Sequence, residues 1–323
     1  MIEVAISNLN FDIAYEMAKE LPNLDEVQIA AILAAMEAKG YDAEVIAGFA
    51  KGISEKLAVN LGKVADTCGT GGDKASTINV STAVAIALST VHPVAKHGNR
   101  SISSKSGSAD VLEVLGVNIE MSPEFAKKMI DETGFAFLFA PLYHKPFAKV
   151  GAVRKKLGIR TIFNIVGPLS NPANPAYQII GVSDEDLLME IARAVDRMDR
   201  RAVVVHGSGL DEVSPSKETL LAIVDDGVDI IKVSPEDFGV RRVSIVECKS
   251  SVESAERIRS VFAGKGLKED RNFIAVNFAA AMFAIGYEDL KEGVEIFENK
   301  IENGEILTKL EEIVCRSTST YRQ

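Results

Sequence analysis

The fold is decided by a stretch that reads Asp66-Thr-Cys-Gly-Thr-Gly-Gly-Asp73, then Ile78-Asn-Val-Ser-Thr82, Lys96-His-Gly-Asn-Arg-Ser-Ile-Ser-Ser104 and Ser106-Gly-Ser-Ala-Asp110. Short apolar segments at 63–67 and 93–96 predict strands. Each is followed by a polar loop and then by a helical pattern, at 77–91 and 109–115. This alternation predicts a mostly parallel sheet with helices on both faces. Because ligands of such sheets bind beyond the carboxyl ends of the strands, we expect the loops to share one edge.

On either side of this stretch the pattern changes. Residues 1–60 predict three short amphipathic helices, with Asp25 and Asp42 as caps, which need a later part of the chain to pack against. The sheet pattern breaks at 141–172 and resumes with strands at 177–182 and 201–206 and a hairpin at 220–233. We therefore predict an α/β protein with a small all-helical domain (1–62 with 143–172) and a larger domain with a mostly parallel sheet (63–142 with 173–323).

Composition restricts the function. The 323 residues are 47% hydrophobic, carry a net charge of −10 and give a pI of about 5.1. This balance disfavours general binding to nucleic acid or to anionic membranes, which needs surplus Lys and Arg. Three separated cysteines are typical of a reducing, cytoplasmic setting, and we see neither a signal peptide nor a spanning helix.

The glycine-rich motif Gly69-Thr-Gly-Gly-Asp73 is typical of an anion-binding loop. Glycines let the backbone approach a ligand, and amides at a following helix start favour negative charge. The spacing fits neither a Walker loop nor a dinucleotide fingerprint, and a simple tight turn is the alternative. Asp73 beside a phosphate cradle suggests a ligand with ribose, a metal ion or both.

The other motifs add compatible groups. Asn79, Ser81 and Thr82 are polar positions in an apolar helix, although helix capping would account for one of them. The loop from Lys96 to Ser108 supplies positive charge and hydroxyls, with a solvated basic loop as the alternative. Asp211-Glu212 follows a strand and is a natural Mg²⁺ site, although acidic pairs are also common on surfaces.

Taken together, these motifs resemble anthranilate phosphoribosyltransferase. The resemblance rests on Gly69–Asp73, Asn79–Thr82, Lys96–Arg100, Ser106–Leu112 and Arg160-Thr-Ile-Phe-Asn164 with Gly167-Pro-Leu. It is dense from about residue 60 to 215. Two departures are Cys68, where a more aliphatic residue is usual, and Lys74, where Gly is common.

The resemblance implies a reaction in tryptophan synthesis: transfer of phosphoribose from phosphoribosyl pyrophosphate (PRPP) to the amine of anthranilate. It implies PRPP binding by Gly69, Thr70, Gly72, Asp73, Thr77, Asn79, Ser81, Thr82, Lys96, His97, Gly98, Asn99, Arg100, Ser103, Ser104 and Ser108. It implies Mg²⁺ at Ser81, Asp211 and Glu212, and anthranilate at Gly69, Asn99 and Arg154. The family is usually a homodimer formed through the helical domains.

We expect catalysis to involve Lys96, Asp73, Arg154 and, in minor proton handling, His97 or His144. Two alternatives stay open from the sequence. A pyrimidine-nucleoside phosphorylase-like enzyme would share the architecture, and a non-catalytic relative would use the scaffold to bind nucleic acid. Asp73, Asp211 and Glu212 disfavour the second of these.

Overall fold

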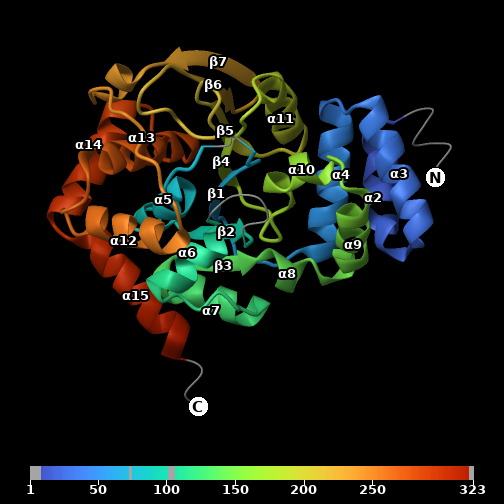
Figure 1. The fold of residues 1–323 in the computed structure, drawn as a ribbon, viewed down its shortest axis with the longest axis horizontal. Coiled ribbons are helices and arrows are strands. Elements are labelled where there is room, and N and C mark those ends of the chain that lie inside the picture. The colour runs from blue at the N-terminus through green and yellow to red at the C-terminus, as the bar shows by residue number, and fades with distance from the viewer. Residues whose placement is uncertain (1–8, 73–74, 101–105, 320–323) are drawn as a thin grey trace.

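One mixed sheet forms the centre of the larger domain (Figure 1). The structure is a computed structural model that describes residues 9–72, 75–100 and 106–319. In these ranges the strands are ordered β3-β2-β1-β4-β5-β6-β7. Their bounds are β1 Ala65–Gly69, β2 Val94–Gly98, β3 Phe135–Phe139, β4 Tyr177–Gly181, β5 Arg201–His206, β6 Thr219–Val224 and β7 Val228–Val233. The first five strands are parallel, and β6 and β7 form the predicted antiparallel hairpin. The mostly parallel sheet is confirmed.

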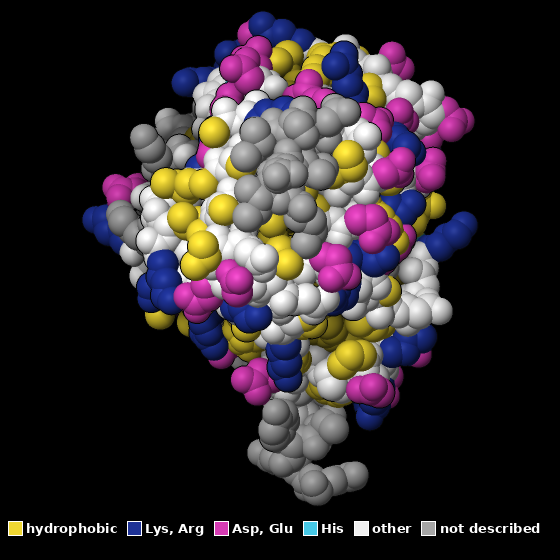
Figure 2. Space-filling view, turned by 90° about the vertical axis from the view of Figure 1, so that its right-hand side faces the viewer, with side chains coloured by type: hydrophobic (Ala, Val, Ile, Leu, Met, Phe, Trp, Pro, Cys, Tyr) yellow, Lys and Arg dark blue, Asp and Glu magenta, His cyan; other side chains and the backbone are white. Residues whose placement is uncertain are grey.

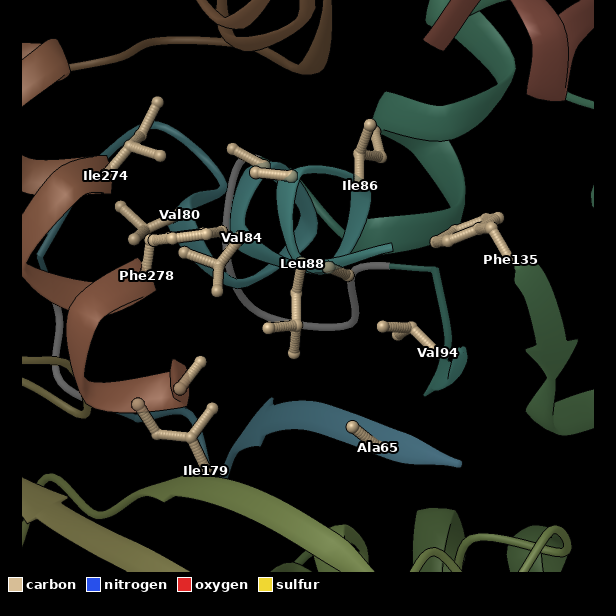
Figure 3. Close-up of a cluster of buried hydrophobic side chains, with 14 of the residues drawn as sticks. Ala65, Val80, Val84, Ile86, Leu88, Val94, Phe135, Ile179, Ile274 and Phe278 are labelled. Atoms are coloured by element: carbon tan, nitrogen blue, oxygen red, sulfur yellow. The ribbon is translucent and has the colours of Figure 1, made fainter. Parts of the chain in front are cut away.

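Helices cover both faces of the sheet. They are α5 Val80–Leu88, α6 Ser108–Leu115, α7 Pro123–Thr133, α11 Asp186–Arg197, α12 Ser251–Phe262, α13 Lys268–Ala284, α14 Leu290–Glu302 and α15 Glu305–Ser319, with a short 3₁₀ turn at Pro235–Phe238. The apolar α5 packs on the sheet beside α13, where Val84 of α5 lies near Phe278 of α13 and Ile179 of β4 (Figure 3). A helix that is apolar on all sides needs such burial. It begins at Val80, three residues later than predicted, so Thr77 precedes the helix.

The N-terminal helices are α2 Phe11–Glu20, α3 Glu26–Lys39 and α4 Ala43–Leu57, with a 3₁₀ turn at Leu21–Asn23. The predicted caps are confirmed, since the side chains of Asp25 and Asp42 accept hydrogen bonds from the first turns of α3 and α4. A Cβ at Gly48 would overlap the Phe11 carbonyl oxygen, which explains how α2 and α4 approach so closely. Figure 2 looks onto this side of the molecule, where hydrophobic side chains lie among charged ones.

The predicted insert packs on these helices. It contains α9 Ala148–Leu157 and α10 Phe163–Val166, with 3₁₀ turns at Lys145–Phe147 and Pro168–Ser170. It follows α8 Ala140–Tyr143, which contacts β3. Phe49 of α4 meets Phe163 of α10 edge to face, with ring centroids 5.3 Å apart. The chain segments that cross between the two parts are hydrogen-bonded, from Val59 N to Pro172 O at 2.8 Å. The exact domain boundaries stay a prediction.

None of the described helices is both long enough and apolar enough to cross a bilayer.

Candidate active site

A cavity of about 310 Å³ lies at the carboxyl ends of β1 and β2. Its wall contains twelve of the residues named from the sequence: Gly69, Gly72, Thr77, Asn79, Ser81, Lys96, His97, Gly98, Asn99, Ser108, Asp211 and Glu212. The predicted convergence of the loops on one edge of the sheet is therefore confirmed for these residues. The strand order also reverses between β1 and β4, the place where open α/β sheets form a ligand crevice.

Other predicted residues lie elsewhere. Asp73, Ser103, Ser104 and the unusual Lys74 fall outside the described residues. Thr70, Thr82, Arg100 and Arg154 do not line the cavity. Thr82 is buried, and its hydroxyl hydrogen-bonds the side chain of Asn79. The side-chain Oδ1 of Asn79 also accepts from Thr82 N at 3.2 Å, so the capping alternative is confirmed for Asn79.

The glycine-rich loop is held against the acidic pair. Gly71 and Gly72 have φ angles of 68° and 86°, a conformation that glycine adopts without strain. Gly71 N donates to Asp211 Oδ2 at 2.8 Å, and Ser183 Oγ donates to Gly71 O at 3.0 Å. A Cβ at Gly69 would overlap the Asp211 carboxylate. The loop and the acids therefore form one unit, although 140 residues separate Gly71 from Asp211.

Lys96 lies inside β2, as the predicted strand at 93–96 implied, and the strand continues for two more residues to Gly98. Its amine is buried, and it donates to the Thr67 carbonyl at 2.6 Å and to Ser81 Oγ at 3.3 Å. Burial lowers the pKa of Lys96, and the nearby Asp66 carboxylate opposes this shift. Burial raises the pKa of Asp66, whose Oδ1 accepts from His97 N at 3.2 Å. Lys96 thus joins β1, β2 and the start of α5 beneath the cavity.

Ser81, Asp211 and Glu212 also line a small recess that continues from the cavity. Their side chains offer carboxylate and hydroxyl oxygens, the donors that Mg²⁺ prefers. The described residues contain no group of three or more His, Cys, Asp and Glu that could enclose a metal ion. A Mg²⁺ ion at these oxygens would thus complete its shell with water and ligand oxygens, as it usually does. Ser81, Asp211 and Glu212 line both this recess and the larger cavity, so an ion at their oxygens would also be within reach of a phosphate in the cavity.

The second loop leads into the start of α6. Gly98 is required there, because a Cβ would overlap Ser108 Oγ and press on Phe137. Arg100 turns toward the outside of α6, where Nη1 donates to Asp110 Oδ1 at 3.1 Å and to Glu113 Oε2 at 2.5 Å. Arg100 therefore forms ion pairs with two acidic residues of α6, the helix whose first residue lines the cavity.

Two imidazoles meet where the sheet joins the helical insert. His97 Nε2 lies 3.1 Å from His144 Nε2, and the rings stack with centroids 4.9 Å apart. Burial lowers the pKa of His144 to about 4. Burial, His144 and Lys96 hold the pKa of His97 well below its usual range. Both rings are therefore neutral at pH 7, so one can donate to the other.

This pair makes stability depend on pH. The pKa of His144 is lower in the folded chain than in the unfolded one, so its contribution is present above about pH 6.5 and is lost as the pH falls toward 4. We expect the wild type to lose about 2–3 kcal/mol more than His144→Gln between pH 7.5 and 4.5, because Gln does not titrate. Urea unfolding at both pH values measures this difference. Equal losses in the two proteins would contradict the assignment.

Arg154 lies on α9, in the helical insert. Nε donates to Thr161 Oγ1 at 3.1 Å and Nη2 to Asn164 Oδ1 at 3.2 Å. The guanidinium lies over the Phe163 ring, 5.0 Å from its centroid. Residues of the motif 160–164 thus fix the orientation of Arg154 while part of its donor set stays available.

Several residues of the cavity and recess walls are not predicted by any sequence motif. Ser76 and Cys248 line the cavity, and Cys248 N donates to Ser76 O at 2.6 Å. Nothing in the sequence links 248 to 76, because the contact depends on how the chain returns over the loop. Asn277 lines the recess. The sequence could have indicated Asn277, because it is a single amide within an otherwise apolar helical run.

Cys68, the first departure, contributes to the wall as a small apolar group. Its thiol lies 3.8 Å from the Pro168 carbonyl. Burial raises the pKa of this thiol well above its usual value, so it stays uncharged.

Comparisons with known proteins agree with this geometry. Residues 61–307 match the model of a glycosyl transferase family, a/b domain, and residues 9–56 match the helical bundle domain of the same family. The chain is 54% identical over 325 residues to anthranilate phosphoribosyltransferase of Pyrococcus furiosus, covering 99% of this chain and 100% of that protein. It is 68% identical over 319 residues to the tryptophan biosynthesis protein TrpCD of Archaeoglobus fulgidus. There it covers 99% of this chain but spans only 58% of that longer relative.

Solved structures give the same result. The anthranilate phosphoribosyltransferase of Thermus thermophilus superposes with a TM-score of 0.92 at 34% identity, covering 98% of this chain and 99% of that one. The Saccharomyces cerevisiae enzyme, solved in complex with PRPP and Mg, superposes with a TM-score of 0.89 at 26% identity, covering 98% and 97%. The agreement extends over both the helical part and the sheet.

Proposed function

The chain belongs to the anthranilate phosphoribosyltransferase family of glycosyl transferases, and we propose that its cavity carries out that reaction: 5-phosphoribose passes from PRPP to the amine of anthranilate, giving N-(5-phosphoribosyl)anthranilate and pyrophosphate. The observation that carries this proposal is the convergence of the glycine-rich loop, the start of α6 and the acidic pair on one cavity. The product would serve tryptophan biosynthesis.

PRPP would occupy the cavity at the ends of β1 and β2. The glycine-rich loop around Gly69 to Gly72 and the start of α6 at 106–108 would lie against the phosphates. The amides of Thr70, Gly71 and Gly107 donate within the protein, so these three would shape the loops and not bind the phosphates directly. Thr77, Asn79, His97 and Asn99 add polar contacts at the wall. Asp73, Ser103 and Ser104 keep their proposed contacts with PRPP from the family resemblance, because they lie outside the described residues. Thr70, Thr82 and Arg100 would support the loops instead of touching the substrate.

Mg²⁺ would be held by Ser81, Asp211 and Glu212 together with oxygens of PRPP. When bound, it neutralises the charge that develops on departing pyrophosphate. The Saccharomyces cerevisiae relative was solved with PRPP and Mg, which supports this site.

The reaction forms a bond from the anthranilate nitrogen to the anomeric carbon and breaks the bond from that carbon to pyrophosphate, which leaves with the electron pair. Buried Lys96 would keep positive charge beneath the leaving group, an electrostatic contribution. Aromatic amines are neutral near pH 7, so a weak acceptor suffices for the amine proton. His97 is neutral and lines the cavity, and it would serve in this minor role.

The test is direct. We would mix the protein with Mg²⁺, PRPP and anthranilate and follow the loss of anthranilate fluorescence. Loss that requires both PRPP and Mg²⁺ supports the proposal. Folded protein that leaves the fluorescence unchanged would overturn it.

Arg154 would bind the anthranilate carboxylate from the helical side of the cleft. We expect Arg154→Ala to raise the KM for anthranilate about tenfold or more and the KM for PRPP less than threefold, because only one substrate loses its ionic partner. Steady-state kinetics with each substrate varied in turn would measure this. Lys155→Ala, a neighbouring exposed cation, is the matched control. Equal changes in both KM values would contradict the role of Arg154.

The two alternative functions have less support. The cavity wall carries Asp211 and Glu212, which would repel a nucleic-acid backbone. A nucleoside phosphorylase would consume inorganic phosphate and a nucleoside, and the named relatives are anthranilate phosphoribosyltransferases.

Assembly and location are also proposals. We propose a homodimer formed through the helical part, supported by Val27, which is 78% exposed on α3. Light scattering of the wild type and of Val27→Glu would test this, and a wild-type monomer would overturn it. The unpaired cysteines Cys68, Cys248 and Cys315 support a cytoplasmic location, which fractionation of the native cells would test.

A further inference from the structure

Asn277 is a polar residue on the apolar face of α13. Ile274, about one turn earlier, and the adjacent Phe278 face α5 in the core (Figure 3). Asn277 is only 4% exposed. A buried carboxamide is costly unless its donors and acceptor are all paired. Its partners therefore show what the residue is for.

The carboxamide holds the backbone of one residue from both sides. Oδ1 accepts from Val213 N at 2.8 Å, and Nδ2 donates to Val213 O at 2.9 Å. The second Nδ2 hydrogen goes to Phe273 O, in its own helix, also at 2.9 Å. This third bond fixes which way the amide faces, so the pair of bonds to Val213 has a defined geometry.

Val213 directly follows the acidic pair Asp211-Glu212. The backbone of that pair is confined on its other side by close packing, because a Cβ at Gly181 would overlap Asp211 O and one at Gly207 would overlap Glu212 O. Asn277 itself lines the recess that contains Ser81, Asp211 and Glu212. The amide therefore fixes the end of the segment whose carboxylates face the recess.

The same helix also supports the opposite wall. Ser81 lies on α5, and α5 packs along α13 through Val80, Val84, Ile274 and Phe278 (Figure 3). α13 is thus a common support for the hydroxyl and the two carboxylates proposed to hold the metal ion. The apolar contacts set the position of α5, and Asn277 sets that of the acids.

We propose that Asn277 is a positioning residue that holds Asp211 and Glu212 at the spacing from Ser81 that Mg²⁺ and PRPP require. This inference rests on the proposed function. The residue touches neither substrate, so its loss acts on metal-dependent PRPP binding and not on anthranilate.

The first experiment measures binding without turnover. Mn²⁺ serves as a spectroscopic probe for Mg²⁺, and its binding in the presence of pyrophosphate is followed by electron paramagnetic resonance. We expect Asn277→Leu, which keeps the approximate volume and loses all three bonds, to weaken Mn²⁺ binding at least tenfold. The matched control is Asn272→Leu on the same helix, whose amide donates to Arg241 O at 3.2 Å, away from the recess. We expect the control to bind within twofold of the wild type.

The second experiment separates positioning from general structural damage. At low Mg²⁺, Asn277→Leu should raise the KM for PRPP at least tenfold. Added Mg²⁺ should return this KM to the wild-type value. The KM for anthranilate should stay within twofold. Asn277→Ser, which leaves room for a water molecule at Val213, repeats the measurement if the Leu variant does not fold.

The outcomes distinguish the proposed function of the cavity from the proposed role of Asn277. A wild type that binds no Mn²⁺ with pyrophosphate and consumes no anthranilate contradicts the proposed function. A functional wild type with folded Asn277 variants that bind Mn²⁺ equally well contradicts the inference alone. So does a parallel rise in both KM values that Mg²⁺ does not restore.

Discussion

The double variant Asp211→Asn, Glu212→Gln is expected to lose about three orders of magnitude in kcat/KM for PRPP, equivalent to about 4 kcal/mol of transition-state stabilisation. Both amides are close in size to the acids, so the recess keeps its shape. They are neutral, however, and lose the charge that binds Mg²⁺ and, through it, the leaving pyrophosphate. Anthranilate fluorescence assays over a range of Mg²⁺ concentrations measure the effect.

A matched control exists in the same chain. Asp225 and Asp226 form an adjacent, exposed acidic pair in the turn between β6 and β7. Converting both to Asn makes the same change in net charge, and activity should remain within twofold. If the Asp211 and Glu212 variant keeps more than a third of wild-type turnover, the acidic pair does not hold the metal.

The second large effect is expected at Gly181, the last residue of β4. Its Cα faces the backbone of Asp211, and an added Cβ would overlap the Asp211 carbonyl oxygen. β4 is paired with Gly69 of β1 on one side and Val205 of β5 on the other, so it cannot move away. We expect Gly181→Ala to destabilise the fold by about 3 kcal/mol through overpacking and to abolish most activity through displacement of Asp211.

Gly151→Ala is the control for this substitution. Gly151 lies inside α9, where an added Cβ meets nothing within 4 Å. Alanine favours a helix over glycine, so we expect a gain in stability of up to about 1 kcal/mol. Thermal unfolding and fluorescence assays of both variants make the comparison. If the Gly181→Ala protein is as stable and active as the wild type, the Asp211 segment can move to accommodate the added Cβ without loss of stability or activity.

Much of the fold could be predicted because its signals are local. Strand and helix periodicity, the caps Asp25 and Asp42 and the hairpin turn at 225–227 each depend on neighbouring residues. The carboxyl-end rule then placed the glycine-rich loop and the start of α6 on the same edge. The predicted strand at 93–96 includes Lys96, but polarity ended that strand two residues too early. The buried amine of Lys96 is accommodated within β2 because the Thr67 carbonyl accepts from it.

The remaining features of the site depend on contacts between segments that are far apart in the sequence. The pairing of Gly71 with Asp211 and of Asn277 with Val213 joins segments that no pattern connects. The motif around Arg100 predicts a phosphate ligand. In the structure, however, Arg100 forms an ion pair with Glu113. Only the folded geometry decides between two such partners.

The way the chain crosses between its two parts has a consequence for synthesis on the ribosome. The core beneath α2–α4 includes Val150, Ile165 and Ile191, which belong to segments made much later. At about 5–20 residues per second, the roughly 90 residues between α4 and α9 take roughly 5 to 18 s to emerge. During that interval the apolar faces of the first helices lack their partners. The nascent chain therefore exposes these apolar faces for longer than a chain with a contiguous helical domain would.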